Sequence, residues 1–174
     1  MKYSLETLQR FKQFELNDND KAKHTFTKDG VTYHRSYLDP KGKWTIGYGS
    51  MIEDDGLTKE QMKNLVITEE EAEARLIKEL EIAENDIKKF VPVFDNLDHN
   101  RQEALIQFSF SLGLPGLQLF EGGQTLHNIN CQAWYSAADS LKRTKWAKDV
   151  GEIRSSAVIH AIKFGLWPGH QNVL

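Results

Sequence analysis

Cysteine is almost absent from this sequence. Cys131 is the only one among 174 residues, so the chain cannot form an intramolecular disulfide. We therefore expect a protein that is made in a reducing compartment or that does not depend on disulfides. Because free cysteines are often buried and no motif surrounds Cys131, we interpret its thiol as a structural one.

Long apolar runs are also missing, and no window of the sequence approaches a membrane span. The first residues, MKYSLETLQRFKQFE, contain neither an apolar core nor a small-residue cleavage site, so we expect no signal peptide and no membrane anchor. The net charge of −3 gives no reason to expect a nucleic-acid partner. Asp18-Asn19-Asp20 lacks the later Gly and Glu of a calcium loop, and we expect neither a metal nor a cofactor.

What the sequence does contain is enough for one packed domain. Hydrophobic residues make up 40% of the chain and charged residues 27%, which argues against disorder. A chain of this length is typical of one domain, residues 1–174, which can fold as two lobes.

The first third of the chain predicts one helix followed by antiparallel strands. Ser4 can cap a helix that ends near Glu15. Asp29-Gly30 indicates a hairpin at about 22–35 in which Phe26 faces Tyr33 and Thr25 faces His34. The alternating stretch that begins at Lys43 is a further strand, so we expect residues 22–50 to form a single small sheet. His24 and His34 then lie on opposite faces, which argues against a shared metal site and favours solvated or hydrogen-bonding histidines.

The rest of the chain predicts helices. Two capping boxes, at Thr58 and Thr68, begin a short helix and the longest one. The longest helix should run over about 68–91 and stop before Pro92, because its apolar residues recur at helical spacing: Leu76, Leu80, Ala83, Ile87 and Phe90.

A buried central helix is expected at 98–112, where apolar residues occur nearly all round. Gly113 should end it, and Pro115-Gly116 should form a turn. Two more helices are expected at about 131–143 and 151–164.

These elements predict an α+β fold that is mostly α-helical. We expect an N-terminal lobe of about 1–67 with a small antiparallel sheet, a linking helix of about 68–91, and a C-terminal helical lobe of about 92–174.

Two carboxyl groups stand in contrasting surroundings, as cleavage of a glycosidic bond requires. Glu15 lies at the negative end of the first helix, beside Phe14 and Leu16, which disfavours its ionised form and suits a proton donor. Asp39 lies in a turn with Lys41 and Lys43, which favour its ionised form. The plainer interpretations are that Glu15 is an ordinary helix-end residue, that Asp39 only forms a turn, and that Thr45 only favours a strand.

Here the residues resemble a known family. Phe14-Glu15, followed by YLDPKGKWTIGYG at 37–49, resembles the signature of the phage T4-type lysozymes, glycoside hydrolase family 24. That signature is a Glu after an N-terminal helix, then Asp, five residues, Thr and Ile-Gly-x-Gly. The resemblance continues over 104–113, which is similar to the central helix of the family, and over Lys145-Trp146 with Arg154.

The resemblance implies a lysozyme-like, two-lobed muramidase that hydrolyses the β-1,4 bond between N-acetylmuramic acid and N-acetylglucosamine in bacterial peptidoglycan. It makes Glu15 the general acid, Asp39 the base or electrostatic partner, and Thr45 the residue that holds the attacking water. Met51 and Phe110 match positions that contact substrate. The family is usually described as inverting.

The resemblance also implies a biological setting. We expect a monomeric phage or prophage endolysin that is made in the host cytoplasm, crosses the membrane by a separate route such as a holin, and lyses the cell from the periplasm and wall. A virion-associated enzyme or a secreted antibacterial effector fits the sequence nearly as well.

The sequence departs from the family pattern in four places. Residues 16–38 make a longer connection between Glu15 and Asp39 than relatives have, so we interpret the hairpin as an insertion. Leu16 replaces a frequent Gly, Ser50 replaces a frequent His, and the net charge is negative where cell-wall lysozymes are commonly basic. Two alternatives therefore stay open: a catalytically silent peptidoglycan-binding module, and a transglycosylase or chitin-type hydrolase on the same fold.

Overall fold

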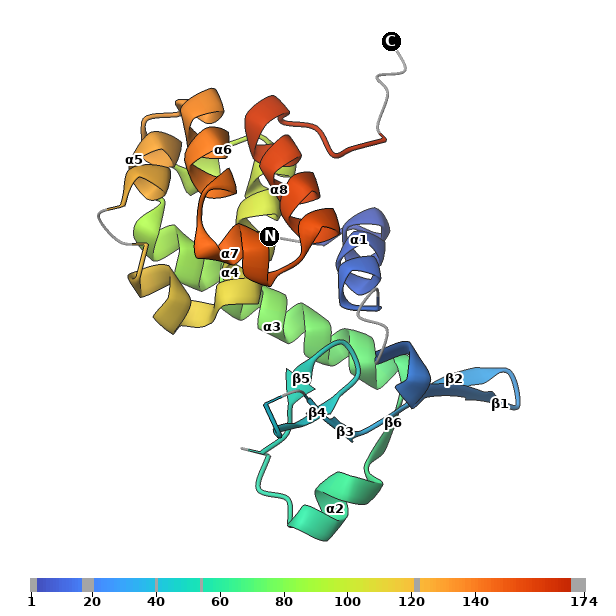
Figure 1. The fold of residues 1–174 in the computed structure, drawn as a ribbon. Helices are drawn as coiled ribbons and strands as arrows, with labels where there is room; N and C mark the ends of the chain where they lie inside the picture. The colour runs from blue at the N-terminus through green and yellow to red at the C-terminus, as the bar shows by residue number, and fades with distance from the viewer. Residues whose placement is uncertain (1–2, 17–20, 40, 54, 121–122, 170–174) are drawn as a thin grey trace. The chain divides into compact units, whose positions relative to one another are not determined.

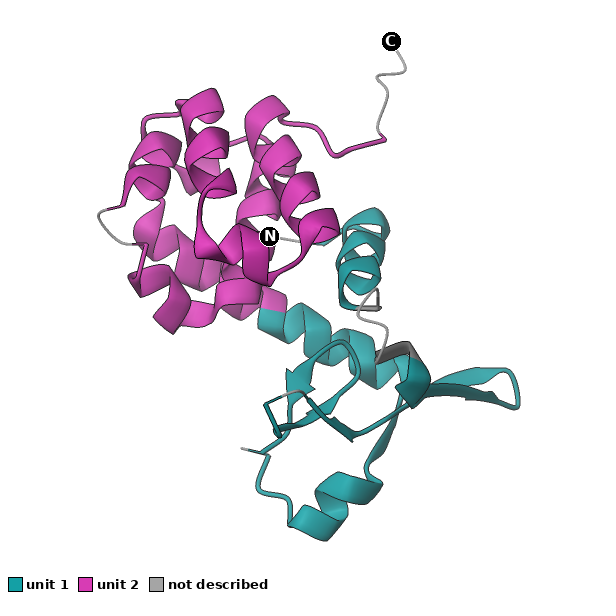
Figure 2. Cartoon of the chain, viewed as in Figure 1, with its two compact units in different colours: residues 1–79 teal, residues 80–174 magenta. Residues whose placement is uncertain are grey.

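The computed structural model describes residues 3–16, 21–39, 41–53, 55–120 and 123–169. It consists of two compact units, residues 1–79 and 80–174, and the division falls within the long helix α3, Glu69–Phe90 (Figure 2). Small antiparallel sheets occur in the first unit and the second unit is helical (Figure 1). The predicted α+β, mostly helical fold class is confirmed.

The first unit begins with α1, Leu5–Leu16. Ser4 caps it as predicted, because the Ser4 hydroxyl accepts a hydrogen bond of 3.1 Å from the backbone N–H of Thr7. Leu8 and Phe11, three positions apart, are buried on one face. This helix places Glu15 in its last turn.

The hairpin forms with the predicted register. A short 3₁₀ turn, η1, Lys21–His24, leads into β1, Thr25–Lys28, and β2, Val31–Arg35, with Phe26 opposite Tyr33 and Thr25 opposite His34. Asp29 and Gly30 both have positive φ, at 51° and 77°. Two such residues are what a tight hairpin turn of matching twist requires.

The prediction of a single sheet over 22–50 is wrong, because the strands divide into two three-stranded sheets. One has the order β1-β2-β6, with β6 at Val66–Thr68; the other joins β3, Tyr37–Leu38, to β4, Trp44–Ile46, and β5, Ser50–Met51. Ser36 separates them, since its N–H donates to the Leu65 carbonyl at 3.0 Å and its hydroxyl to the Met62 carbonyl at 2.5 Å. Ser36 is thereby hydrogen-bonded to the segment that precedes β6.

The turn between β4 and β5 packs tightly against α3. Gly47 and Gly49 have φ of 61° and 102°. A Cβ at Gly47 would lie 3.1 Å from the Cβ of Ala72, which is fully buried in the first turns of α3. Gly47 therefore meets two demands at once, a left-handed backbone and close approach to a helix.

We expect Gly47→Ala to lower the free energy of unfolding by about 2–3 kcal/mol, because left-handed strain costs about 1–2 kcal/mol and overpacking adds about 1 kcal/mol or more. Gly42→Ala is the matched control, since Gly42 has φ of 76° but nothing within 4 Å of a new Cβ. Urea unfolding of both variants measures the difference. Equal losses in the two variants would contradict the close approach to Ala72.

The two capping boxes form as predicted. Thr58 and Gln61 cap α2, Lys59–Asn64, reciprocally. The Glu71 carboxylate accepts from the Thr68 N–H at 2.8 Å and the Thr68 hydroxyl accepts from the Glu71 N–H at 3.2 Å, which starts α3. Four residues of the predicted apolar stripe are buried, namely Leu76, Leu80, Ala83 and Ile87, and α3 ends before Pro92.

The second unit surrounds α4, His99–Gln118, whose central residues 103–109 are all buried. The other elements are η2, Phe94–Asn96; α5, Gln124–Asn130; α6, Trp134–Lys142; α7, Lys145–Asp149; and α8, Glu152–Phe164. The helix α8 packs against α4 and α6. Two side chains of α4 bind carbonyl groups at the C-terminal end of α8. Asn100 donates to the Gly165 carbonyl at 2.8 Å, and Arg101 donates to the Ile162 carbonyl at 2.9 Å.

The predicted turn at Pro115-Gly116 is wrong, whereas the predicted break at Gly113 is confirmed. Gly113 has φ of 66° and ψ of 170°, so the helix is interrupted there, and a second helical segment then contains Pro115. Proline is tolerated in a first helical turn because its missing N–H would have no partner there.

One expectation at the end of α5 also differs from the structure. Cys131 is exposed, with its Sγ 3.7 Å from Nε2 of His127, so the expectation of a structural, buried thiol is wrong.

The helices α5 and α7 were not predicted, because they have seven and five residues and carry no periodic apolar stripe long enough to detect. In the part of the chain that the structure describes, no helix is both long and apolar enough to cross a membrane.

Candidate active site

Glu15 is held in the last turn of α1 and is only 4% exposed. Glutamate is rarely buried to this extent at a helix end. The same face of the helix buries Phe11. The structure thus presents a carboxyl group largely removed from water, which is the type of group that can carry a proton to a leaving oxygen.

Asp39 follows β3 directly and shapes the turn between β3 and β4. Its Oδ1 accepts the backbone N–H groups of Lys41 and Lys43, both at 2.8 Å, and its own N–H donates to the Lys43 carbonyl at 2.9 Å. Asp39 is therefore a turn former, as the plainer interpretation had it. Both side-chain bonds use Oδ1, and within the described residues Oδ2 has no hydrogen bond.

Thr45 is buried in β4 and is fixed by the same backbone group as Asp39. Its hydroxyl donates to the Lys43 carbonyl at 3.1 Å, the oxygen that also accepts the Asp39 N–H. With that donor engaged, the lone pairs of Thr45 Oγ1 remain able to accept a hydrogen bond. Lys43 thus sets the spacing between a carboxylate and a hydroxyl.

The structure places two of the five candidate residues in one sheet, and a third directly after one of its strands. Thr45 pairs with Met51 of β5, and Asp39 follows the strand that pairs with Thr45. Met51 is 60% exposed, so a ligand can reach its thioether. Glu15 belongs to the same unit, on α1, whereas Phe110 lies half-buried on α4 in the second unit.

Sequence reasoning missed a group of charged and polar side chains in the first unit, which we call the Glu69 cluster. Glu69 Oε1 accepts from Lys12 Nζ and from the Tyr48 hydroxyl, both at 2.6 Å, and Oε2 lies 2.6 Å from His34 Nε2. Glu73 joins through Lys12 Nζ, at 2.7 Å. The cluster ties α1, β2, the β4–β5 turn and α3 together. Its members are far apart in the chain, so no local motif indicates it.

Burial opposes the charges in this cluster, and the hydrogen bonds outweigh burial. Burial alone raises the pKa of Glu69, but the bonds from Lys12, Tyr48 and His34 lower that pKa below its ordinary value. Burial alone lowers the pKa of Lys12, but the bonds to Glu69 and Glu73 raise that pKa above its ordinary value. Burial, and then the bond to Glu69, raise the pKa of Tyr48, so its hydroxyl stays a donor.

We expect the stabilisation by Glu69 to be complete above its ordinary pKa of 4.5 and to be lost as the pH falls through the lowered folded-state pKa. The raised pKa of Lys12 keeps that side chain charged throughout this range. Thermal unfolding midpoints between about pH 3 and pH 7 should therefore fall less steeply in Glu69→Gln than in the native chain. Glu70→Gln is the control and should keep the native slope; a native slope in Glu69→Gln would contradict the assignment.

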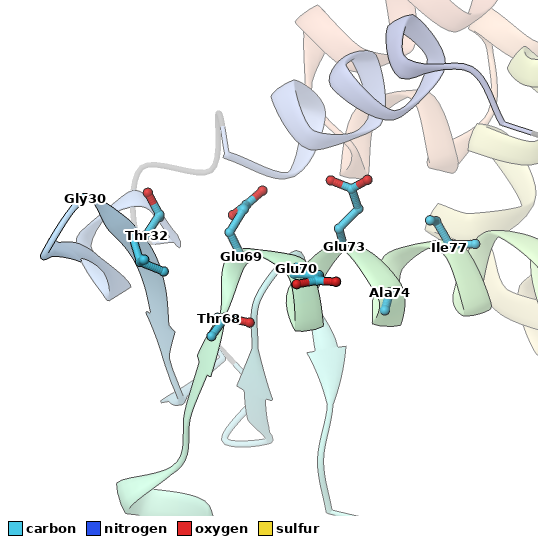
Figure 3. A pocket seen from close by; sticks show the side chains of 9 residues that line it. Gly30, Thr32, Thr68, Glu69, Glu70, Glu73, Ala74 and Ile77 are labelled. Atoms are coloured by element: carbon cyan, nitrogen blue, oxygen red, sulfur yellow. The ribbon is translucent and has the colours of Figure 1, made fainter.

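An open hollow of about 720 Å³ lies beside the same cluster, between the hairpin and α3 (Figure 3). Thr32 lines it from β2, and Glu69, Glu70 and Glu73 line it from α3. Figure 3 shows Glu69 and Glu73 projecting from the same side of α3. Among the described side chains, no group of three His, Cys, Asp or Glu residues is placed to hold a metal ion.

Comparisons with known proteins point to one family. The family model described as Phage lysozyme matches residues 28–160. That range includes Asp39, Thr45, Met51 and Phe110, and it begins after Glu15. The chain is 30% identical over 148 residues to Probable T4-type lysozyme 1 of Dictyostelium discoideum. The matched region covers 74% of this chain and 85% of the relative. It is 28% identical to Probable T4-type lysozyme 2 of the same organism, with the same coverage.

Proposed function

The chain belongs to the phage lysozyme family, and from that membership we propose that it cleaves the β-1,4 bond between N-acetylmuramic acid and N-acetylglucosamine in bacterial peptidoglycan. Membership makes it a glycoside hydrolase. The observation that carries the proposal is the shared anchoring of Asp39 and Thr45 on the Lys43 carbonyl, which holds a carboxylate and a hydroxyl in one turn.

Glu15 is the general acid in this proposal. Its place at the end of α1 and its 4% exposure support this role, because they hold the carboxyl group in a fixed position largely removed from water. The bond to the leaving sugar then breaks as the oxygen takes the proton.

Asp39 and Thr45 act on the water that replaces the leaving group. Oδ1 of Asp39 is engaged by two backbone N–H groups, so Oδ2 is the oxygen that receives a proton from water. The Thr45 hydroxyl donates to Lys43, so it accepts a hydrogen bond from that water and orients it. Water adds to the anomeric carbon, its proton passes to Asp39, and no cofactor takes part.

Met51 and Phe110 are proposed to contact the glycan. The exposed thioether of Met51 beside Thr45 supports this role. Phe110 stays a prediction from the resemblance, as does the division into lobes over 1–67, 68–91 and 92–174 within one lysozyme domain. We also retain, as a proposal, the role of a monomeric phage endolysin that lyses its host after holin-dependent release.

The test is reducing-end release from purified Gram-negative sacculi, with binding to the sacculi measured in parallel by sedimentation. We expect reducing ends to appear in proportion to enzyme and time. Binding without release would favour the silent binding module instead. Release from chitin at an equal or higher rate would favour the chitin-type hydrolase.

A further inference from the structure

We propose that Glu69 is a positioning residue for this reaction, holding the end of α1 that carries Glu15, the turn that follows Thr45, and the β1–β2 hairpin in one arrangement. This inference rests on the proposed function. Glu69 is not itself a catalytic residue, because its three hydrogen bonds go to side chains of the protein.

The first link runs to the helix of Glu15. Lys12 and Glu15 are three positions apart on α1, which places them on the same face about one turn apart. Lys12 Nζ is held at 2.6 Å by Glu69 and at 2.7 Å by Glu73. Two carboxylates on α3 thus fix the last turn of α1, and with it the position of Glu15.

The second link runs to the turn after Thr45. Tyr48 lies three residues beyond Thr45, is 4% exposed, and donates to the same Glu69 oxygen that binds Lys12. Its ring centroid is 5.2 Å from Lys12 Nζ, so α1 and the turn also contact each other directly. The tight packing of Gly47 on Ala72 leaves this turn little freedom to move.

The third link runs to the hairpin. His34 on β2 is 2% exposed and reaches the second oxygen of Glu69 at 2.6 Å. Its ring also lies against that of Tyr48, with centroids 5.2 Å apart. The hairpin, interpreted from sequence as an insertion, is therefore joined through Glu69 to both segments that carry the proposed catalytic residues.

Lys12 and Tyr48 bind the same oxygen of Glu69, so the positions of the segments that carry Glu15 and Thr45 depend on one another. Charge-assisted bonds of this length are the strong kind, and a misplacement of about 1 Å in a catalytic group can cost about 100-fold in rate. Loss of the Glu69 charge should therefore affect turnover more than substrate affinity, because the cluster has no described contact with the exposed Met51 surface.

The experiment measures kcat and KM on solubilised peptidoglycan chains for the native chain, Glu69→Gln, Tyr48→Phe and the double variant. We expect kcat to fall about 10- to 100-fold in Glu69→Gln and about 5- to 20-fold in Tyr48→Phe, with KM within about twofold of native. The double variant should be no slower than Glu69→Gln, because both changes remove one link. Glu70→Gln, the same change at the next residue of α3, should keep native values.

Each result separates this inference from the proposed function. An inactive native chain would remove the proposed function, whereas an active native chain with native kcat in Glu69→Gln would remove the positioning role. A loss confined to KM, or one explained by the unfolded fraction in circular dichroism, would also overturn it. If Glu69→Gln does not fold, Tyr48→Phe decides, because it removes one hydroxyl and keeps the packed ring.

Discussion

Replacing Glu15 with Gln is expected to lower kcat for peptidoglycan cleavage by about 1,000-fold, and at least 100-fold, because a positioned general acid contributes about 10²–10⁴-fold. Gln has the size and hydrogen-bonding shape of a protonated Glu but cannot give up a proton. The side chain is 4% exposed, so a substitution that preserves its volume is needed to keep the packing at the end of α1.

The matched control is Glu6→Gln, the same change in the first turn of the same helix. Glu6 forms an exposed ion pair with Arg10 at 2.9 Å, which is worth only about 0.5 kcal/mol. Both variants are to be compared with native by circular dichroism before kcat is measured. Native kcat in folded Glu15→Gln would show that the acid is another residue.

Replacing Asp39 with Asn is expected to lower kcat by about 10²–10³-fold with little loss of stability. The amide oxygen of Asn can accept the same two N–H bonds, from Lys41 and Lys43, that Oδ1 accepts in the native chain. The turn should therefore survive, while the group that receives the proton from water is lost. This substitution separates the turn-forming role of Asp39 from the proposed catalytic one.

Asp29→Asn serves as the control for Asp39→Asn, since Asp29 also lies in a turn of the first unit and Asn tolerates its φ of 51°. We expect native kcat from Asp29→Asn. If Asp39→Asn kept more than about half of native kcat while folded, Asp39 would be a turn former only, and Thr45 would lose its partner in orienting water.

Sequence predicted best where the structure is decided locally. The hairpin register follows from Asp29-Gly30, because both residues adopt the positive φ that the turn needs. The start of α3 follows from the reciprocal bonds of Thr68 and Glu71, and its end from Pro92. Each of these signals lies within a few residues of the feature it specifies.

Sequence failed where contacts join distant segments. Strand β6 is three residues long and finds its partner in β2, more than thirty positions away, so nothing nearby indicates it. The Glu69 cluster joins residues separated by 57, 35 and 21 positions. The burial of Cys131 was predicted wrongly because burial of a free thiol is only a tendency of the residue type, whereas here Cys131 is the exposed C-cap of α5.

The residues of the candidate site were predicted from signals of different kinds. Asp39 and Thr45 are six residues apart, and the structure joins them through one carbonyl. Glu15 was assigned from its place at a helix end and from resemblance, and the family match begins after it, at residue 28.

Hydrolysis at the muramic acid side of the glycosidic bond is tested most directly by the identity of the new sugar end. Digested sacculi are to be reduced with borohydride, hydrolysed, and analysed for the reduced amino sugar. We predict reduced muramic acid that rises with digestion time and stays at background in Glu15→Gln. Reduced glucosamine, or sacculi that dissolve without any new reduced sugar, as a 1,6-anhydro product formed without water would give, would contradict a muramidase-type hydrolysis.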